Sequence, residues 1–120
     1  MEWTTERRYR RYEDWTKEEK QAIQENMAKS PWHTHYHVEP KAGLLNDPNG
    51  FSYFDGKWIL FYQNFPFGAA HGLKSWVQTE SEDLVHFKET GVTLLPDTDL
   101  DSHGAYSGSA MQFDDKLFLF

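Results

Sequence analysis

Residues 1–30 follow a helical pattern. Thr16 and Glu19 have the spacing of a capping box, in which each side chain accepts a hydrogen bond from the backbone N–H of the other residue. Apolar residues then recur at helical spacing from Ile23 onward, with charged and amide residues between them. Pro31 ends the pattern, because the residue before a proline avoids the α-helical region. The sequence therefore predicts an N-terminal helical arm with one helix between Thr16 and Pro31.

The second part of the chain alternates apolar and polar residues with a period of two, which is typical of β-strands. Residues 51–54 and 57–62 flank Asp55-Gly56, and an Asp-Gly pair between two such segments predicts a tight hairpin. Residues 76–81 predict a third strand and residues 85–89 predict a fourth. Together the four segments predict one antiparallel unit.

The layout of the first hairpin begins again near the end of the chain. Residues 109–113 and 116–120 flank an acidic pair, so the order of strand, acidic turn, lysine and apolar strand is repeated. A four-stranded unit followed by the start of another favours a β-propeller. No turn follows the last apolar strand, and natural domains avoid such an unpaired edge. We therefore expect a longer parent protein. In the isolated chain we expect residues 104–120 to self-associate, to pair in a non-native way or to be partly disordered.

Composition narrows the class of protein. The chain has 120 residues, enough for one small domain, and 38% of them are hydrophobic, which favours a folded chain. It carries 12 Lys and Arg residues against 19 Asp and Glu residues, a formal net charge of −7. This balance disfavours nucleic-acid and anionic-membrane partners, because phosphate contacts need clustered cations. We interpret the four arginines between residues 7 and 11 as part of a solvated terminus.

The sequence also limits where the protein can be located in the cell and which kinds of site it can contain. It has no cysteine, which excludes disulfides, thiolate zinc sites and cysteine nucleophiles. No apolar stretch approaches the ~20 residues of a membrane span. The N-terminus lacks the basic end and apolar core of a secretory signal. These features together predict a cytoplasmic protein.

Four motifs follow one another along the chain, and the first consists of residues 36–37 and the sequence GLLNDPNG at residues 43–50. This motif resembles the opening motif of glycoside hydrolase family 32, the β-fructosidases, whose usual form is WMNDPNG. Residues 61–63, residues 76–87 and residues 107–110 resemble the motifs that follow it. Within the family, the chain is most similar to the bacterial branch that acts on sucrose 6-phosphate.

The resemblance implies a fold and a catalytic residue. It implies a mainly β protein, in which an N-terminal α-helix precedes the first blade and the start of the second blade of a five-bladed β-propeller. Residues 31–120 would form the N-terminal part of this glycosidase domain. Asp47 falls on the position of the nucleophile in a retaining mechanism, and a carboxylate suits this task because it is ionised at neutral pH. We expect Pro48 and Gly50 to fix a turn around Asp47.

The resemblance also implies contacts with a sugar substrate. An amide beside the nucleophile can both donate to and accept from fructose hydroxyls. Lys74 and His71 are the candidates for contacts with a phosphate, on the basis of charge and loop position, and we expect Trp76 to pack rather than bind. The substrate-binding residues that the resemblance implies are Leu44, Leu45, Asn46, Gln63, His71, Tyr106 and Ser107.

Two further patterns suggest metal sites but fail in detail. The histidines of residues 33–37 alternate, so a strand would place them on one face, yet nothing supplies a further carboxylate or thiolate. The aspartates of residues 97–101 resemble the start of an EF-hand loop, but Ser102 and Gly108 stand where that loop requires Gly and Glu. We therefore predict no metal and no cofactor.

The function that follows from the resemblance is hydrolysis of sucrose 6-phosphate, or of sucrose, to fructose and glucose 6-phosphate, or glucose. The acid/base glutamate of the family lies in a motif that this chain does not contain, so we expect the chain alone to be inactive. Two alternatives stay open. The parent could be a fructan hydrolase, or the chain could belong to a non-catalytic carbohydrate-binding module.

Overall fold

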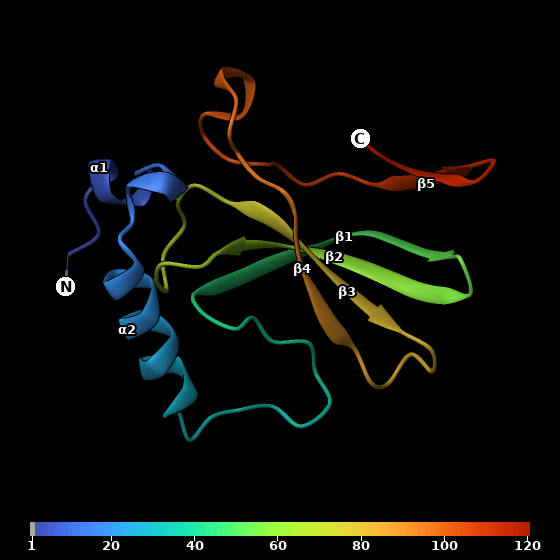
Figure 1. The fold of residues 1–120 in the computed structure, drawn as a ribbon, viewed down its shortest axis with the longest axis horizontal. Coiled ribbons are helices and arrows are strands. Elements are labelled where there is room, and N and C mark those ends of the chain that lie inside the picture. The colour runs from blue at the N-terminus through green and yellow to red at the C-terminus, as the bar shows by residue number, and fades with distance from the viewer. Residues whose placement is uncertain (1) are drawn as a thin grey trace.

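The computed structural model describes residues 2–120 and consists mainly of antiparallel β-structure (Figure 1). Four strands form one sheet in sequential order, and two more form a separate hairpin. The strands are β1 (Leu44–Phe54), β2 (Lys57–Phe65), β3 (Ser75–Ser81), β4 (Lys88–Leu94), β5 (Ala110–Phe113) and β6 (Lys116–Leu119). Every neighbouring pair is antiparallel, which confirms the mainly β class and the antiparallel unit.

The N-terminal segment contains the predicted helix and two shorter elements that were not predicted. Helix α1 (Thr5–Arg8) and a single 3₁₀ turn (Tyr12–Asp14) precede α2 (Lys17–Ala28). The predicted capping box is present, because the backbone N–H of Glu19 donates to Thr16 Oγ1 at 3.1 Å and that of Thr16 donates to Glu19 Oε2 at 2.9 Å. The prediction of this helix is confirmed. A second 3₁₀ turn (Asp99–Asp101) follows β4.

The N-terminal segment packs on one end of the first sheet (Figure 1). Trp15 is only 2% exposed and its ring stacks on that of Phe67, with centroids 4.2 Å apart. The guanidinium groups of Arg7 and Arg10 lie 5.4 and 4.7 Å from the centre of the Trp15 ring. The interpretation as a solvated terminus is therefore wrong for Arg7 and Arg10, since cation–π contacts hold both against the core, whereas Arg11 is exposed.

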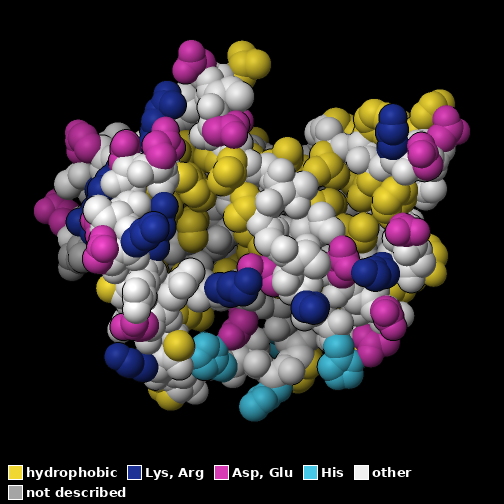
Figure 2. Space-filling view, in the orientation of Figure 1, with side chains coloured by type: hydrophobic (Ala, Val, Ile, Leu, Met, Phe, Trp, Pro, Cys, Tyr) yellow, Lys and Arg dark blue, Asp and Glu magenta, His cyan; other side chains and the backbone are white. Residues whose placement is uncertain are grey.

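A second cluster joins the two sheets. Ile59, Phe61 and Trp76 are buried, and Leu117 and Leu119 of β6 pack against them. Other apolar side chains of β5 and β6 stay exposed, and Figure 2 shows hydrophobic atoms gathered over this hairpin. The second sheet is therefore anchored on one face only.

Among the helices of residues 2–120, none combines the length and the apolar character that crossing a membrane requires.

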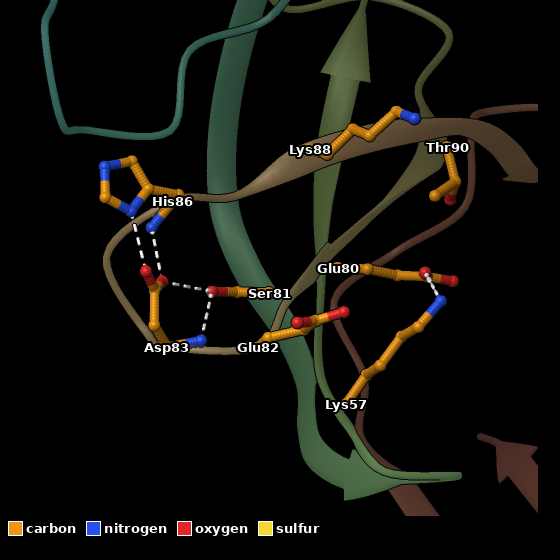
Figure 3. Close-up of a pocket in the computed structure, with 8 residues that line it drawn as sticks. All are labelled: Lys57, Glu80, Ser81, Glu82, Asp83, His86, Lys88 and Thr90. Atoms are coloured by element: carbon orange, nitrogen blue, oxygen red, sulfur yellow. Dashed lines mark hydrogen bonds and ion pairs between the residues drawn. The ribbon is translucent and has the colours of Figure 1, made fainter.

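The fourth strand begins later than predicted. Residues 85–87 lie outside the strand, because the Asp83 carboxylate accepts hydrogen bonds from the backbone N–H groups of Val85 and His86 at 2.9 and 2.8 Å. Figure 3 shows the bond from His86. A side chain that satisfies these groups competes with strand pairing. The prediction of a strand at residues 85–89 is therefore wrong for most of its length, and β4 is Lys88–Leu94.

Candidate active site

Asp47 lies in an irregularity of β1. The pairing of β1 with β2 shifts register between Asn46 and Pro48, so the strand bulges at this aspartate. Asp47 has φ of +31°, a region that Asp and Asn tolerate better than most residues. The expectation of a turn around Asp47 is wrong, because the motif continues as a strand on both sides. A proline fits here since it has no backbone N–H to give to the sheet.

The carboxylate of Asp47 is exposed and held in its ionised form. Ser107 Oγ donates to Asp47 Oδ2 at 2.5 Å. This hydrogen bond, followed by the side chain of Asn46, keeps the pKa of Asp47 below its ordinary value of 3.8, and the positive charge of Lys74 acts in the same direction. An ionised and exposed carboxylate can act as a nucleophile at neutral pH.

A chain of amide hydrogen bonds orients Asn46. Asn46 and Gln63 are cross-strand partners, and Asn46 Nδ2 donates to Gln63 Oε1 at 2.9 Å. Gln63 is only 4% exposed, and its Nε2 donates to the backbone oxygen of Ala105 at 2.8 Å. The buried amide therefore connects the residue beside Asp47 to the segment that carries Ser107.

That segment, residues 105–108, is tied to the first sheet by side-chain contacts. Trp76 is buried, as expected of a packing residue, and its Nε1 also donates to the backbone oxygen of Tyr106 at 2.9 Å. The backbone N–H of Gly108 donates to Asn49 Oδ1 at 3.1 Å. These contacts fix the backbone on both sides of Ser107, so its hydroxyl is already positioned on Asp47.

These residues surround a pocket of about 320 Å³, within the size range of small-molecule sites. Leu44 and Leu45 do not belong to the described lining, and Leu44 instead packs against the cluster around Phe65. Seven of the expected residues do line the pocket: Asn46, Asp47, Gln63, His71, Lys74, Tyr106 and Ser107.

Tyr9 and His103 also line the pocket, and neither was expected. Their rings lie 5.4 Å apart, although one comes from the N-terminal segment and the other from the loop after β4. Local pattern offers no signal for such residues, because their position depends on how the N-terminal segment packs.

Neither of the two segments considered as metal sites has the backbone structure that its pattern suggested. The histidines of residues 33–37 lie in an irregular segment rather than a strand, and His33 Nδ1 lies 2.6 Å from Glu39 Oε1. The aspartates at residues 99 and 101 belong to a capped 3₁₀ turn, where Asp101 accepts from Thr98. Within residues 2–120, no three His, Asp or Glu side chains are placed to hold an ion.

Sequence comparison assigns most of the chain to a family. The model of the glycosyl hydrolases family 32 N-terminal domain matches residues 37–120. The chain is 75% identical over 113 residues to the sucrose-6-phosphate hydrolase of Streptococcus mutans, which covers 94% of this chain and 24% of that protein. It is 56% identical over 119 residues to the enzyme of the same name from Lactococcus lactis, covering 99% and 25%.

Solved structures agree with this assignment. The sucrose-6-phosphate hydrolase of Lactobacillus gasseri superposes with a TM-score of 0.94 at 53% identity, covering 98% of this chain and 24% of that one. A family 32 β-fructofuranosidase of Bombyx mori superposes with a TM-score of 0.72 at 34% identity, covering 91% and 23%. The chain thus spans about a quarter of the length of these relatives. By sequence and by fold, it belongs to glycoside hydrolase family 32.

Proposed function

We propose that the protein containing this chain is a retaining β-fructofuranosidase that hydrolyses sucrose 6-phosphate to fructose and glucose 6-phosphate. The observation that carries the proposal is the Asp47 carboxylate, which Ser107 and Asn46 hold ionised at the wall of a pocket of about 320 Å³. The names of the bacterial relatives support the choice of substrate.

In the proposed mechanism, Asp47 attacks the anomeric carbon of the fructosyl unit. The hydrogen bond from Ser107 to Oδ2 holds the carboxylate in place for this attack. The glycosidic oxygen leaves with a proton from a carboxylic acid, and water then releases fructose from the enzyme. That acid belongs to a part of the protein outside this chain, and in retaining enzymes it stands about 5–5.5 Å from the nucleophile.

Asn46 is proposed to bind a fructose hydroxyl. Its Oδ1 is buried and has no hydrogen-bond partner among the described residues, while its Nδ2 is occupied by Gln63. A buried acceptor without a partner is costly, and a sugar hydroxyl that donates to it would remove this cost. Binding of substrate would thus complete the hydrogen bonding of the site.

The architecture proposed for the parent is a five-bladed β-propeller preceded by the helical arm of residues 1–30. The four-stranded sheet would form the first blade, and β5 with β6 would begin the second. Residues 31–120 would then be the N-terminal part of the glycosidase domain. This chain alone would be inactive, because it lacks the general acid. The predictions of a cytoplasmic location and of no cofactor stay predictions.

Replacing Asp47 in the full-length protein tests the proposal. Asp47→Asn keeps the shape of the side chain but removes its charge, so kcat on sucrose 6-phosphate should fall by about 10³-fold or more. Asp55→Asn is the matched control, since Asp55 also has a positive φ, +48°, but lies in the exposed turn between β1 and β2. This control should keep kcat unchanged.

Three results would contradict the proposal. Retention of kcat per folded molecule in Asp47→Asn, with a lower thermal midpoint, would make Asp47 a structural residue. Faster turnover of inulin or levan than of sucrose 6-phosphate would identify a fructan hydrolase. Sugar binding without turnover of any of these substrates would identify a carbohydrate-binding module.

A further inference from the structure

One side of the Asp47 pocket is cationic. Lys74 and His71 both line it, and Lys74 Nζ lies 2.9 Å from His71 Nδ1. An ammonium group has only protons to donate, so His71 Nδ1 is the acceptor and the ring carries its proton on Nε2. The pair therefore offers the remaining ammonium protons and one imidazole N–H to a ligand.

Lys74 differs from Lys57, which lines another pocket. Lys57 and Glu80 point toward one another in Figure 3, with Nζ and Oε2 only 2.7 Å apart, and this contact raises the pKa of Lys57. Lys74 has no carboxylate within ion-pair distance among residues 2–120, and burial lowers its pKa. A partly desolvated cation without a bonded anion is unfavourable, so this site favours an anionic ligand.

The backbone that carries these side chains is fixed on two sides. The backbone N–H of Leu73 donates to the oxygen of Arg8 at 2.8 Å. Gly72 lies so close to the same oxygen that a Cβ at this position would stand 2.5 Å from it. On the other side, the backbone N–H of Ala105 donates to the oxygen of Lys74 at 2.8 Å. A ligand that binds here would not have to order this loop.

The pocket holds a single carboxylate beside this cation, and the two charges act on each other, because Lys74 helps to lower the pKa of Asp47. Asp47 is the only carboxylate among its described lining residues, and its Oδ2 is held by Ser107. A phosphate at the cationic side would therefore meet little repulsion beyond that of the nucleophile itself. Charge-assisted hydrogen bonds of this kind are roughly twice as strong as neutral ones.

We propose that Lys74 and His71 bind the phosphate group of the phosphorylated sugar and thereby determine its preference over the unphosphorylated one. The proposal rests on the proposed function, since it concerns the same pocket. Lys74 supplies charge and His71 supplies a directed N–H. The N-terminal segment takes part indirectly, because the backbone of Arg8 holds the loop in place.

The test uses the full-length protein with Lys74→Met, and Lys57→Met as the matched control. Two quantities are measured: the ratio of kcat/KM for sucrose 6-phosphate to that for sucrose, and the Kd of glucose 6-phosphate by titration calorimetry. Loss of a hydrogen-bonded charge should lower the ratio about 100-fold and weaken the Kd by a similar factor. Lys74→Arg should recover part of both, and Lys57→Met should change neither.

Each alternative result overturns the inference. Equal losses of kcat/KM on both substrates would assign Lys74 to the fold or the chemistry, and an unchanged Kd would place the phosphate elsewhere. The calorimetric arm also separates the two proposals. If the wild type hydrolyses neither substrate, the proposed function fails, while a weaker Kd in Lys74→Met still supports the phosphate site and an unchanged Kd still overturns it.

Discussion

Gln63 is the buried amide whose removal should affect both stability and the site. Gln63→Leu keeps the size of the side chain but deletes its two hydrogen bonds, from Asn46 Nδ2 and to the oxygen of Ala105. Since Gln63 is 4% exposed, water cannot replace the lost partners without opening the sheet. The substitution therefore leaves one donor and one acceptor unsatisfied.

The expected cost follows from these two groups. A buried polar group without a partner costs about 1–3 kcal/mol, so the pair should cost about 2–6 kcal/mol in the free energy of unfolding. The contact with Asn46 is only partly buried, which favours the lower half of this range. Asn46 would also lose its fixed orientation beside Asp47, so kcat on sucrose 6-phosphate should fall about 10-fold, as expected for a positioning residue.

Urea unfolding of the full-length protein, followed by tryptophan fluorescence, measures the change in stability. Gln112→Leu is the control, because Gln112 lies exposed on β5 and donates one hydrogen bond to the oxygen of Asp114. It should change stability by less than about 0.5 kcal/mol. The reasoning is refuted if Gln63→Leu is as harmless as this control. The double variant with Asn46→Ala should show a cost smaller than the sum of the single costs, because the two residues share a hydrogen bond.

Three further predictions address the core, the nucleophile and the exposed hairpin. Trp15→Ala should cost about 3–5 kcal/mol in the same unfolding assay, since it empties a packed aromatic site, and a cost near zero would show that the N-terminal segment is not part of the core. Ser107→Ala removes the hydrogen bond that lowers the pKa of Asp47, so the acidic limb of kcat/KM should move to higher pH, and an unmoved limb would contradict this. The isolated 120-residue chain should self-associate in analytical ultracentrifugation through exposed residues such as Met111 and Phe118, 56% and 48% exposed, and their replacement by Ser should reduce it. A monodisperse chain would count against this surface.

Signals that act over a few residues were readable in the sequence. The capping box of α2 and the Asp55-Gly56 hairpin depend on contacts between near neighbours, and both are present. The φ values of +48° and +77° at this pair suit the tight hairpin turn that such a pair favours. The order of the motifs indicated the family, because each motif can be identified from a few adjacent residues. The position of Asp47 within the NDPNG motif also came from the sequence, whereas its role as nucleophile stays a prediction.

Tertiary structure decided what depends on distant residues. Strand β4 begins later than predicted because the Asp83 side chain accepts hydrogen bonds from the backbone N–H groups that a strand would use. Tyr9 reaches the pocket only because the N-terminal segment packs on the sheet, a contact that no local pattern contains. The decisive contact of the site, Ser107 on Asp47, joins positions 60 residues apart in the chain. Periodicity and propensity describe neighbours along the backbone, so only the folded sheet could show that this hydroxyl meets this carboxylate.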